Sequence, residues 1–301
     1  MRITGSTRLA GIMGWPIAHS RSPALHNFWL DQYGIDGVYV PLAVRPEQLE
    51  TALRALPALG FRGCNLTIPH KQKALAIVDR VDPVARRIGA VNTVVVASDG
   101  RLEAWNTDVY GFRENLRDIV PDWQAATGPA VVLGAGGAAR AVIAALAEDG
   151  VSEIRLVNRT MARAAEVAHD LAAPRCRITV HPWGEREAAL RDAGILVNTT
   201  SLGMVGEPGL EIELTELPVS AVVVDIVYVP LETPLLAAAR QRGHRVVDGL
   251  GMLLHQGRPG FEAWFGTPVR VSDELRAAVL PTLAPAGPAM AGAARQQRGS
   301  Q

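Results

Sequence analysis

PAVVLGAGGAARAVIAALAEDG, at residues 129–150, is the stretch that decides the fold of this 301-residue chain. Its apolar run at 130–133 has the length of a buried strand, the glycines after it allow a tight turn, and the alanine-rich run that follows is typical of a helix. A second apolar run at 153–157 and a helical pattern at 161–171 come next. Strand, glycine turn, helix and strand in this order predict a βαβ unit with parallel strands.

The same alternation continues on both sides of this unit. After it, strand-like runs stand at 177–181, 195–198, 221–225 and 245–247. Before it, strand-like runs at 9–14, 38–44, 61–68 and 91–97 alternate with helical patterns at 24–33 and 46–56, and an SDG turn at 98–100 predicts a hairpin with 102–105. Further helices are expected at 110–119, 250–264 and 272–283. This alternation predicts an α/β fold with a parallel sheet covered by helices on both faces.

Composition excludes several classes of protein. Lys plus Arg and Asp plus Glu both number 30, so the chain lacks the basic excess that is typical of nucleic-acid binders. We find no signal peptide and no apolar run of membrane-spanning length, which predicts a soluble cytoplasmic protein. The two cysteines, Cys64 and Cys176, cannot form a disulfide framework and stand in no cluster with histidine, so no metal site is expected.

The glycine turn fits a dinucleotide fingerprint. Gly134 permits the tight turn, Gly136 lets the backbone approach a pyrophosphate, and Ala139 allows close contact between helix and strand. The helix N-terminus offers N–H groups and positive potential to the phosphates. The alternative is a glycine-rich turn that binds nothing, and the surrounding βαβ unit argues against it.

The end of the second strand indicates which dinucleotide is bound. NAD sites place an Asp or Glu there for the ribose hydroxyl, whereas this chain has LVNRTMAR at 156–163. Arg159 and Arg163 offer fixed positive charge that suits a 2′-phosphate. A solvated helix start is the alternative, but arginine at a helix N-terminus is electrostatically unfavourable. NADP is therefore the expected cofactor.

Four polar clusters interrupt the apolar first third of the chain: HSRSPALHN (19–27), NLTIPHK (65–71), GAVNT (89–93) and WNTD (105–108). Hydroxyl, amide, ammonium and carboxylate groups at strand ends suit the recognition of a polyhydroxylated acid. Each cluster also has a simpler interpretation. Ser22 could cap the following helix, Lys71 and Asp108 could form a surface ion pair, and Asn92 could be a turn residue.

Over residues 9 to about 266, the chain resembles the shikimate dehydrogenases in an ordered set of motifs. These motifs are GWPIAHSRSPALHN, GCNLTIPHK, GAVNT, NTD, GAGGAA, NRTMAR, NTTSLGM, DIVYVPLETPLL and DGLGMLLHQG. Two departures, Trp15 and Thr199, lie outside the expected chemistry. The resemblance implies an N-terminal α/β substrate domain at 1–108, completed by helices at about 250–284, and a Rossmann-type NADP-binding domain at 109–249, with a cleft between them. The Ala/Gly/Pro/Gln-rich tail at 285–301 is expected to be disordered.

The resemblance also assigns the site residues. It implies a catalytic pair, Lys71 and Asp108, and a carboxylate site of Ser20 and Ser22 helped by Tyr228. The ring hydroxyls would be bound by Asn65, Thr67, Asn92, Asp108 and Gln256. NADP would be held by Gly134, Ala135, Gly136, Gly137, Ala138, Asn158, Arg159, Thr160 and Arg163, with Ile226 and Gly249 beside the nicotinamide.

The implied reaction is the reversible reduction of 3-dehydroshikimate to shikimate. A Lys ammonium can stabilise the developing alkoxide and supply its proton. Burial would lower the pKa of Lys71 and a close Asp108 would raise it, so the balance stays open. A quinate/shikimate dehydrogenase, another two-domain NADP enzyme such as methylenetetrahydrofolate dehydrogenase, and an NADP-sensing binding protein are the rival interpretations. A homodimer remains open; no nucleic-acid or membrane partner is expected.

Overall fold

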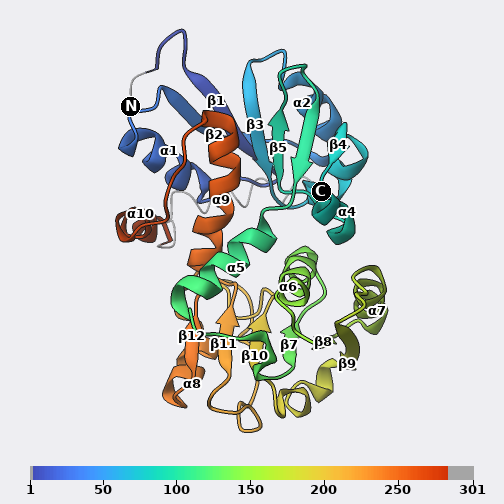
Figure 1. Cartoon of the computed structure of the whole chain (residues 1–301). Coiled ribbons are helices and arrows are strands. Elements are labelled where there is room, and N and C mark those ends of the chain that lie inside the picture. The colour runs from blue at the N-terminus through green and yellow to red at the C-terminus, as the bar shows by residue number, and fades with distance from the viewer. Residues whose placement is uncertain (1–2, 284–301) are drawn as a thin grey trace. The chain divides into compact units, whose positions relative to one another are not determined.

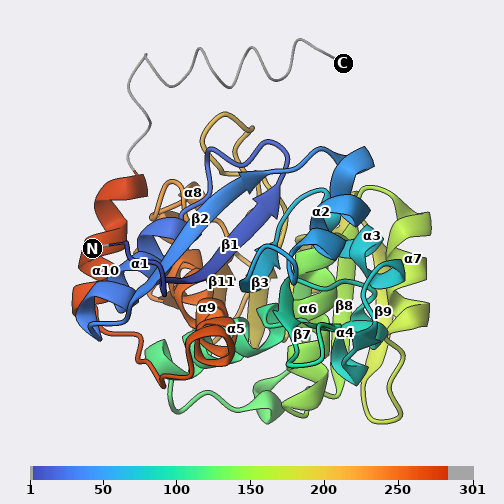
Figure 2. The same ribbon diagram turned by 90° about the horizontal axis from the view of Figure 1, so that it is seen from above.

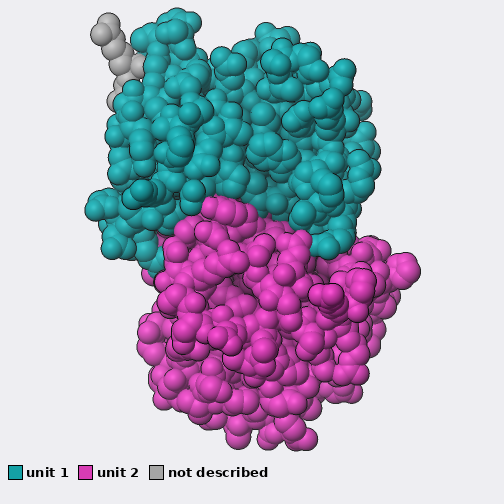
Figure 3. All heavy atoms as spheres, in the orientation of Figure 1, with its two compact units in different colours: residues 1–107, 257–301 teal, residues 108–256 magenta. Residues whose placement is uncertain are grey.

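The computed structural model describes residues 3–283 and divides into two compact units (Figure 3). The first unit comprises residues 1–107 together with 257–301, and the second comprises residues 108–256. The expected disordered tail at 285–301 lies outside the described residues. The long helix α9 (Gly249–Phe265) returns the chain from the second unit to the first.

The second unit is built on a six-stranded sheet in which every pairing is parallel. Figure 1 shows its strands side by side, in the order β12-β11-β10-β7-β8-β9. The strands are β7 (Ala130–Leu133), β8 (Glu153–Asn158), β9 (Arg177–Pro182), β10 (Ile195–Asn198), β11 (Val222–Asp225) and β12 (Arg245–Val247). This is the doubly wound order, and it reverses between β7 and β10, where such sheets bind ligands. The predicted parallel sheet is confirmed.

Helices precede and connect these strands. They are α5 (Asp108–Ile119), α6 (Gly137–Glu148), α7 (Met161–Asp170) and α8 (Pro234–Gln241), with short 3-10 helices η3 (Ala125–Thr127), η4 (Trp183–Glu185) and η5 (Ala188–Leu190). The central strands β7, β10 and β11 are buried along their whole length, which explains why the sequence reads there as continuous apolar runs rather than alternating ones.

The first unit has a mixed six-stranded sheet in the order β2-β1-β3-β5-β6-β4. Its strands are β1 (Arg8–Gly14), β2 (Gly37–Ala43), β3 (Phe61–Leu66), β4 (Arg80–Val81), β5 (Thr93–Val96) and β6 (Leu102–Trp105). β1 runs parallel to both β2 and β3, whereas β5 runs antiparallel to β3 and β6. The β5–β6 pair confirms the hairpin predicted from the SDG turn.

The helices of the first unit are α1 (Ser22–Gln32), α2 (Leu49–Ala55), α3 (His70–Lys73), α4 (Pro83–Ile88) and α10 (Asp273–Val279), with 3-10 helices η1 (Pro46–Gln48), η2 (Ala74–Ala76) and η6 (Leu280–Leu283). Helix α10 packs on α1 beside the sheet (Figure 2). The single helix predicted at 272–283 is wrong in its last turn, because Pro281 cannot continue the α-helical hydrogen bonding and a 3-10 turn replaces it. Strand β4 and helices α3 and α4 were not predicted, being too short to show a period.

Candidate functional site

The glycine turn lies between β7 and α6, at the carboxyl edge of the second unit's sheet. Gly134 has a φ of +102°, a conformation that favours glycine, and its N–H donates to the Val157 carbonyl at 2.8 Å. No side chain caps the start of α6, and a Cβ added at Gly136 or Gly137 would meet no atom within 4 Å. Uncapped N–H groups beside open space can receive the pyrophosphate of a dinucleotide.

The end of β8 carries the arginines predicted to select NADP. Asn158 closes the strand and its side-chain amide donates to the Thr160 carbonyl at 2.8 Å. Helix α7 then begins without a side-chain cap at Thr160. Within residues 3–283, the side chains of Arg159 and Arg163 form no ion pair and no hydrogen bond, and both residues are exposed. Two unneutralised guanidinium groups at this edge fit a 2′-phosphate and would not require a carboxylate to be displaced.

In the first unit, the sheet brings three of the polar clusters to one edge. The carboxyl ends of the parallel strands β1 and β3 lie at this edge, and β5 begins there because it runs antiparallel to β3. The backbone N–H of Thr67 donates to the Met13 carbonyl at 3.0 Å, and that of Trp15 donates to the Ile68 carbonyl at 3.2 Å. The segment that leads into the HSRSP cluster therefore lies against the NLTIPHK cluster.

Asn65 and Asn92 belong to one buried hydrogen-bond network. The Asn65 amide donates to the Asn92 carbonyl and to the Thr93 hydroxyl, both at 3.1 Å. The side-chain oxygen of Asn92 accepts from the Thr107 backbone N–H at 2.8 Å. Asn92 thereby fixes the segment that leads into Asp108, and it is not a simple turn residue.

Tyr39 joins the same network and was not predicted from the sequence. Its hydroxyl donates to the Asn65 side-chain oxygen at 2.6 Å, and its ring stacks on that of His26 with 4.0 Å between centroids. Burial lowers the pKa of His26 to about 3, so this histidine is neutral. Nothing in the local sequence singles out Tyr39; the signal is the position of β2 beside β1 in the sheet.

Ser20 and Ser22 lie at the start of α1. Ser22 is the first residue of the helix and is buried, while the N-cap position is Arg21, which makes no side-chain capping bond. The Ser22 backbone N–H donates to the Ser20 hydroxyl oxygen at 3.3 Å. The alternative that Ser22 caps the helix is therefore wrong, and both hydroxyls are available for another purpose.

Lys71 lies in α3, and its carbonyl accepts from the Val91 N–H at 2.8 Å, which holds it next to the GAVNT cluster. Six of the nine predicted substrate residues thus fall in the first unit: Ser20, Ser22, Asn65, Thr67, Lys71 and Asn92. The other three, Asp108, Tyr228 and Gln256, fall in the second unit.

Within the second unit, helix α5, which begins at Asp108, packs on α9 beside Gln256. Asp108 is the first residue of α5 and Gly111 follows one turn later on the same face. A Cβ at Gly111 would come within 2.7 Å of the Gln256 Cβ, so only glycine permits this approach. Helix packing therefore sets the spacing between these two predicted substrate groups.

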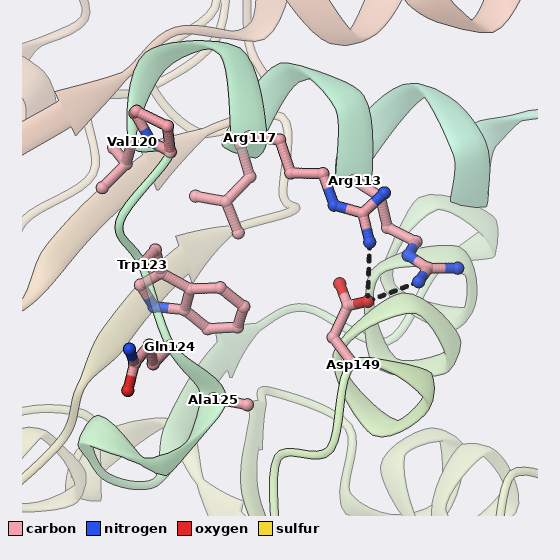
Figure 4. A pocket seen from close by; sticks show the side chains of 9 residues that line it. Arg113, Arg117, Val120, Trp123, Gln124, Ala125 and Asp149 are labelled. Carbon is pink, nitrogen blue, oxygen red and sulfur yellow. Dashed lines mark hydrogen bonds and ion pairs between the residues drawn. The ribbon is translucent and has the colours of Figure 1, made fainter.

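A surface cavity of about 530 Å³ lies elsewhere in the second unit (Figure 4). It is bounded by α5, the segment before β7 and Asp149 after α6, which places it at the amino edge of the sheet. Arg113 and Arg117 both pair with the Asp149 carboxylate, at 2.5 Å and 3.5 Å. Because its arginines are already neutralised, this cavity is a poorer phosphate site than the glycine edge.

Two features of the described chain bear on other classes of function. Among residues 3–283 no group of three or more His, Cys, Asp or Glu side chains is arranged to hold a metal ion. In the same part of the chain, no helix combines the length and the apolar character needed to cross a membrane. Both cysteines are buried and free.

Family models match both halves of the chain. The shikimate dehydrogenase substrate binding domain matches residues 12–94, and the shikimate / quinate 5-dehydrogenase model matches residues 116–227. A protein of Paramagnetospirillum magneticum named shikimate dehydrogenase (NADP(+)) is 61% identical over 278 residues, which cover 92% of this chain and 100% of that relative. The chain belongs to the shikimate dehydrogenase family.

Solved structures of the family are similar throughout. Shikimate 5-dehydrogenase from Thermus thermophilus, in complex with NADP(H) and shikimate, has a TM-score of 0.79 and 37% identity, over 92% of this chain and 98% of that one. Quinate dehydrogenase from Corynebacterium glutamicum, in complex with NAD, has a TM-score of 0.85 and 33% identity, over 91% and 99%. Both branches of the family therefore share the fold described above, and only the site residues can distinguish them.

Proposed function

We propose that the protein is an NADP-dependent shikimate dehydrogenase, an oxidoreductase that reversibly reduces 3-dehydroshikimate to shikimate in the biosynthesis of aromatic amino acids. The observation that carries this assignment is the pair of unneutralised arginines, Arg159 and Arg163, at the end of β8 in a chain of this family. The 61% identity to a shikimate dehydrogenase (NADP(+)) over nearly the whole chain supports it.

The residues of the second unit fit the cofactor. The glycine turn, Gly134 to Ala138, would hold the pyrophosphate against the N-terminus of α6, and the segment from Asn158 to Arg163 would hold the adenosine and its 2′-phosphate. Ile226 and Gly249 would lie beside the nicotinamide. When bound, NADPH supplies the hydride.

The substrate is held by neutral donors and amides. Ser20 and Ser22 donate to the carboxylate, with Tyr228 as a third donor, and hydrogen bonds to an ionised acceptor are stronger than those between neutral groups. Asn65, Thr67, Asn92 and Gln256 bind the ring hydroxyls. Several of these groups are buried and already hydrogen-bonded, so their orientation is set before the substrate arrives.

Lys71 and Asp108 carry out the proton transfer. The Lys71 ammonium stands at the ketone oxygen, stabilises the negative charge that develops there, and donates the proton that completes the alcohol. Asp108 orients the ammonium and accepts from a neighbouring ring hydroxyl. In the oxidation of shikimate, Lys71 takes the same proton back.

A steady-state assay tests the proposal. Purified protein is mixed with NADPH and 3-dehydroshikimate, and oxidation of NADPH is followed by absorbance; the reverse reaction uses NADP⁺ and shikimate. We expect turnover in both directions and a higher kcat/KM for shikimate than for quinate. Preferred turnover of quinate with NAD⁺ would favour a quinate/shikimate dehydrogenase. Tight NADP⁺ binding without turnover of either acid would indicate a sensing protein.

We also propose that the enzyme works in the cytoplasm. NADPH carries several negative charges and does not cross membranes, so the enzyme must share its compartment, and the two free buried cysteines suit a reducing one. Fractionation of cells tests this location. Sedimentation velocity tests the homodimer, which would give a species of twice the 32.1 kDa chain mass.

A further inference from the structure

A buried carboxylate holds the loop that follows β11. Asp225 is the last residue of this strand and is 1% exposed. Its Oδ1 accepts from the Val227 backbone N–H and from the Asn198 side-chain amide, both at 3.0 Å, and its Oδ2 accepts from the Thr233 hydroxyl at 2.7 Å. One side chain therefore ties both ends of the 226–233 segment to the sheet.

The orientation of Asn198 is itself fixed. The Thr200 backbone N–H and hydroxyl both donate to the Asn198 side-chain oxygen, at 3.0 and 2.7 Å. An oxygen is the only atom of the amide that can accept these protons, so the NH₂ end faces Asp225. The loops after β10 and β11 are thereby joined at the reversal point of the sheet.

The backbone of the same segment is confined by a glycine. A Cβ at Gly249, the first residue of α9, would collide with the Ile226 carbonyl and come within 2.7 Å of the Val227 oxygen. The start of α9 thus lies directly on the backbone that Asp225 holds. The hydrogen bond at Val227 and the close packing against Gly249 restrict the backbone conformation of residues 226–227.

Burial raises the pKa of Asp225 to about 6, and its three hydrogen bonds oppose that rise. All three donors are neutral, so this group is not half of an ion pair. The structural effect of Asp225 is therefore to hold the 226–233 segment in position. Thr233 reinforces this effect, because the same hydroxyl that donates to Asp225 accepts from the Leu236 N–H and caps α8.

We propose that Asp225 is a positioning residue for the reaction: it holds residues 226–228 so that Ile226 lies against the nicotinamide and Tyr228 reaches the substrate carboxylate. The inference rests on the proposed function, which assigns those two residues. It predicts an asymmetry along the cofactor. The nicotinamide end depends on Asp225, whereas the adenosine end, held at β8, does not.

The test compares Asp225→Ala with Asp225→Asn. Alanine removes every acceptor, so we expect kcat/KM for shikimate to fall about 10–100-fold, as small displacements at a reacting centre do. Asparagine keeps one oxygen for Val227 and Asn198, so it should restore kcat/KM to within about threefold of the unmodified enzyme. Calorimetry with adenosine 2′,5′-bisphosphate, which lacks the nicotinamide, should give the same Kd within about twofold for all three proteins, while the Kd for NADP⁺ rises in the alanine variant.

Ser272→Ala is the matched control, because Ser272 caps α10 in the first unit and its loss destabilises a helix end without touching this loop. It should leave kcat/KM unchanged.

If Asp225→Ala fails to fold, Thr233→Val removes one of the three donors and should lower kcat/KM about threefold to tenfold. Three outcomes would overturn the inference. The first is an unchanged kcat/KM in Asp225→Ala, or in Thr233→Val where that variant replaces it, and the second is an Asp225→Asn variant that does not restore kcat/KM. The third is an equal loss of affinity for NADP⁺ and for adenosine 2′,5′-bisphosphate. An inactive unmodified protein would instead reject the proposed function, and the two affinities would still test Asp225.

Discussion

The hydroxyl of Tyr39 donates a 2.6 Å hydrogen bond to the side-chain oxygen of Asn65, in the buried interior of the first unit. Both protons of the Asn65 amide are already committed, one to the Asn92 carbonyl and one to the Thr93 hydroxyl. The amide therefore cannot turn over, and what it has left to offer is the second lone pair of its oxygen. Asn65 would accept from a substrate hydroxyl rather than donate to one.

Tyr39→Phe removes the bond that keeps this oxygen in place. A neutral hydrogen bond contributes about 0.5–1.5 kcal/mol, so we expect the KM for shikimate to rise roughly twofold to tenfold. The KM for NADP⁺ should not change. Tyr33→Phe, at a residue 40% exposed in the same unit, is the control. Equal KM values for shikimate in both variants would mean that Tyr39 contributes packing alone and that its hydrogen bond to Asn65 does not affect substrate binding.

Lys71→Ala should lower kcat by roughly 10²–10⁴-fold, the range found when a general acid is lost. Lys73→Ala is a close control. Lys73 lies two residues along the same short helix, is exposed, and donates to the Pro46 carbonyl at 2.8 Å. Steady-state kinetics and melting curves of both variants separate chemistry from stability. Near-normal turnover by a folded Lys71→Ala enzyme would remove this residue from the mechanism.

The fold could be predicted from the sequence where local physics decides it. The buried strands of the second unit appear as short apolar runs because both of their faces are covered, and the glycine turn is visible because Gly134 needs its positive φ. The β5–β6 hairpin follows from its turn residues in the same way. In each case the cause lies within about ten residues of its effect.

The rest depends on contacts between distant residues. Asp225 reads in the sequence as the end of a strand, and its partners Asn198 and Thr233 are 27 and 8 residues away. Tyr39 meets Asn65 across 26 residues, through the pairing of β1 with both β2 and β3. These positioning contacts depend on strand order, and no periodicity or motif in one sequence encodes that order.

Asp225 should leave a signature in the pH dependence of stability. Its pKa is raised from 3.8 to about 6 in the folded state, so the folded protein keeps this proton at pH values where the unfolded chain has lost it. The stabilisation from this group is therefore fully present below about pH 4 and lost as the pH rises through about 6. The change amounts to roughly 2–3 kcal/mol.

Asp225→Asn cannot titrate and isolates this contribution. Urea denaturation of both proteins at about pH 4.5 and about pH 7.5 gives the difference in unfolding free energy at each pH. The variant should gain stability relative to the unmodified protein as the pH rises. If the difference in unfolding free energy is the same at both pH values, burial does not raise the pKa of the Asp225 carboxyl.

The arginines at the end of β8 should set cofactor preference. We expect kcat/KM for NADPH to exceed that for NADH, and Arg163→Ala to raise the KM for NADP⁺ while leaving that for NAD⁺ nearly unchanged, because only NADP carries the 2′-phosphate. Arg175→Ala, at an exposed site after α7, controls for loss of charge. A preference for NADH in the unmodified protein would revive the quinate dehydrogenase assignment.

Ser20 and Ser22 should contribute unequally to carboxylate binding. Burial raises the pKa of Tyr39 well above its ordinary value and the Ser22 side chain opposes that rise, so the buried Ser22 hydroxyl lies beside the Tyr39 phenol. Ser20 accepts from the Ser22 N–H, which leaves the Ser20 proton to donate. The Tyr39 phenol would compete with a carboxylate for the buried Ser22 hydroxyl, whereas the Ser20 hydroxyl has no such competitor.

We therefore expect Ser20→Ala to raise the KM for shikimate roughly ten- to a hundredfold, and Ser22→Ala to raise it less, by about tenfold or below. Neither variant should lose more than a few tenths of a kcal/mol of stability, because neither hydroxyl caps α1. Ser272→Ala should behave in the opposite way: Ser272 does cap a helix, so its loss should cost about 1 kcal/mol of unfolding free energy and leave KM unchanged. Measuring KM and melting temperature on all three variants tests both statements together. A Ser22→Ala enzyme that melts early with an unchanged KM would restore the helix-capping role, and the carboxylate would then have to be held by Ser20 and Tyr228 alone.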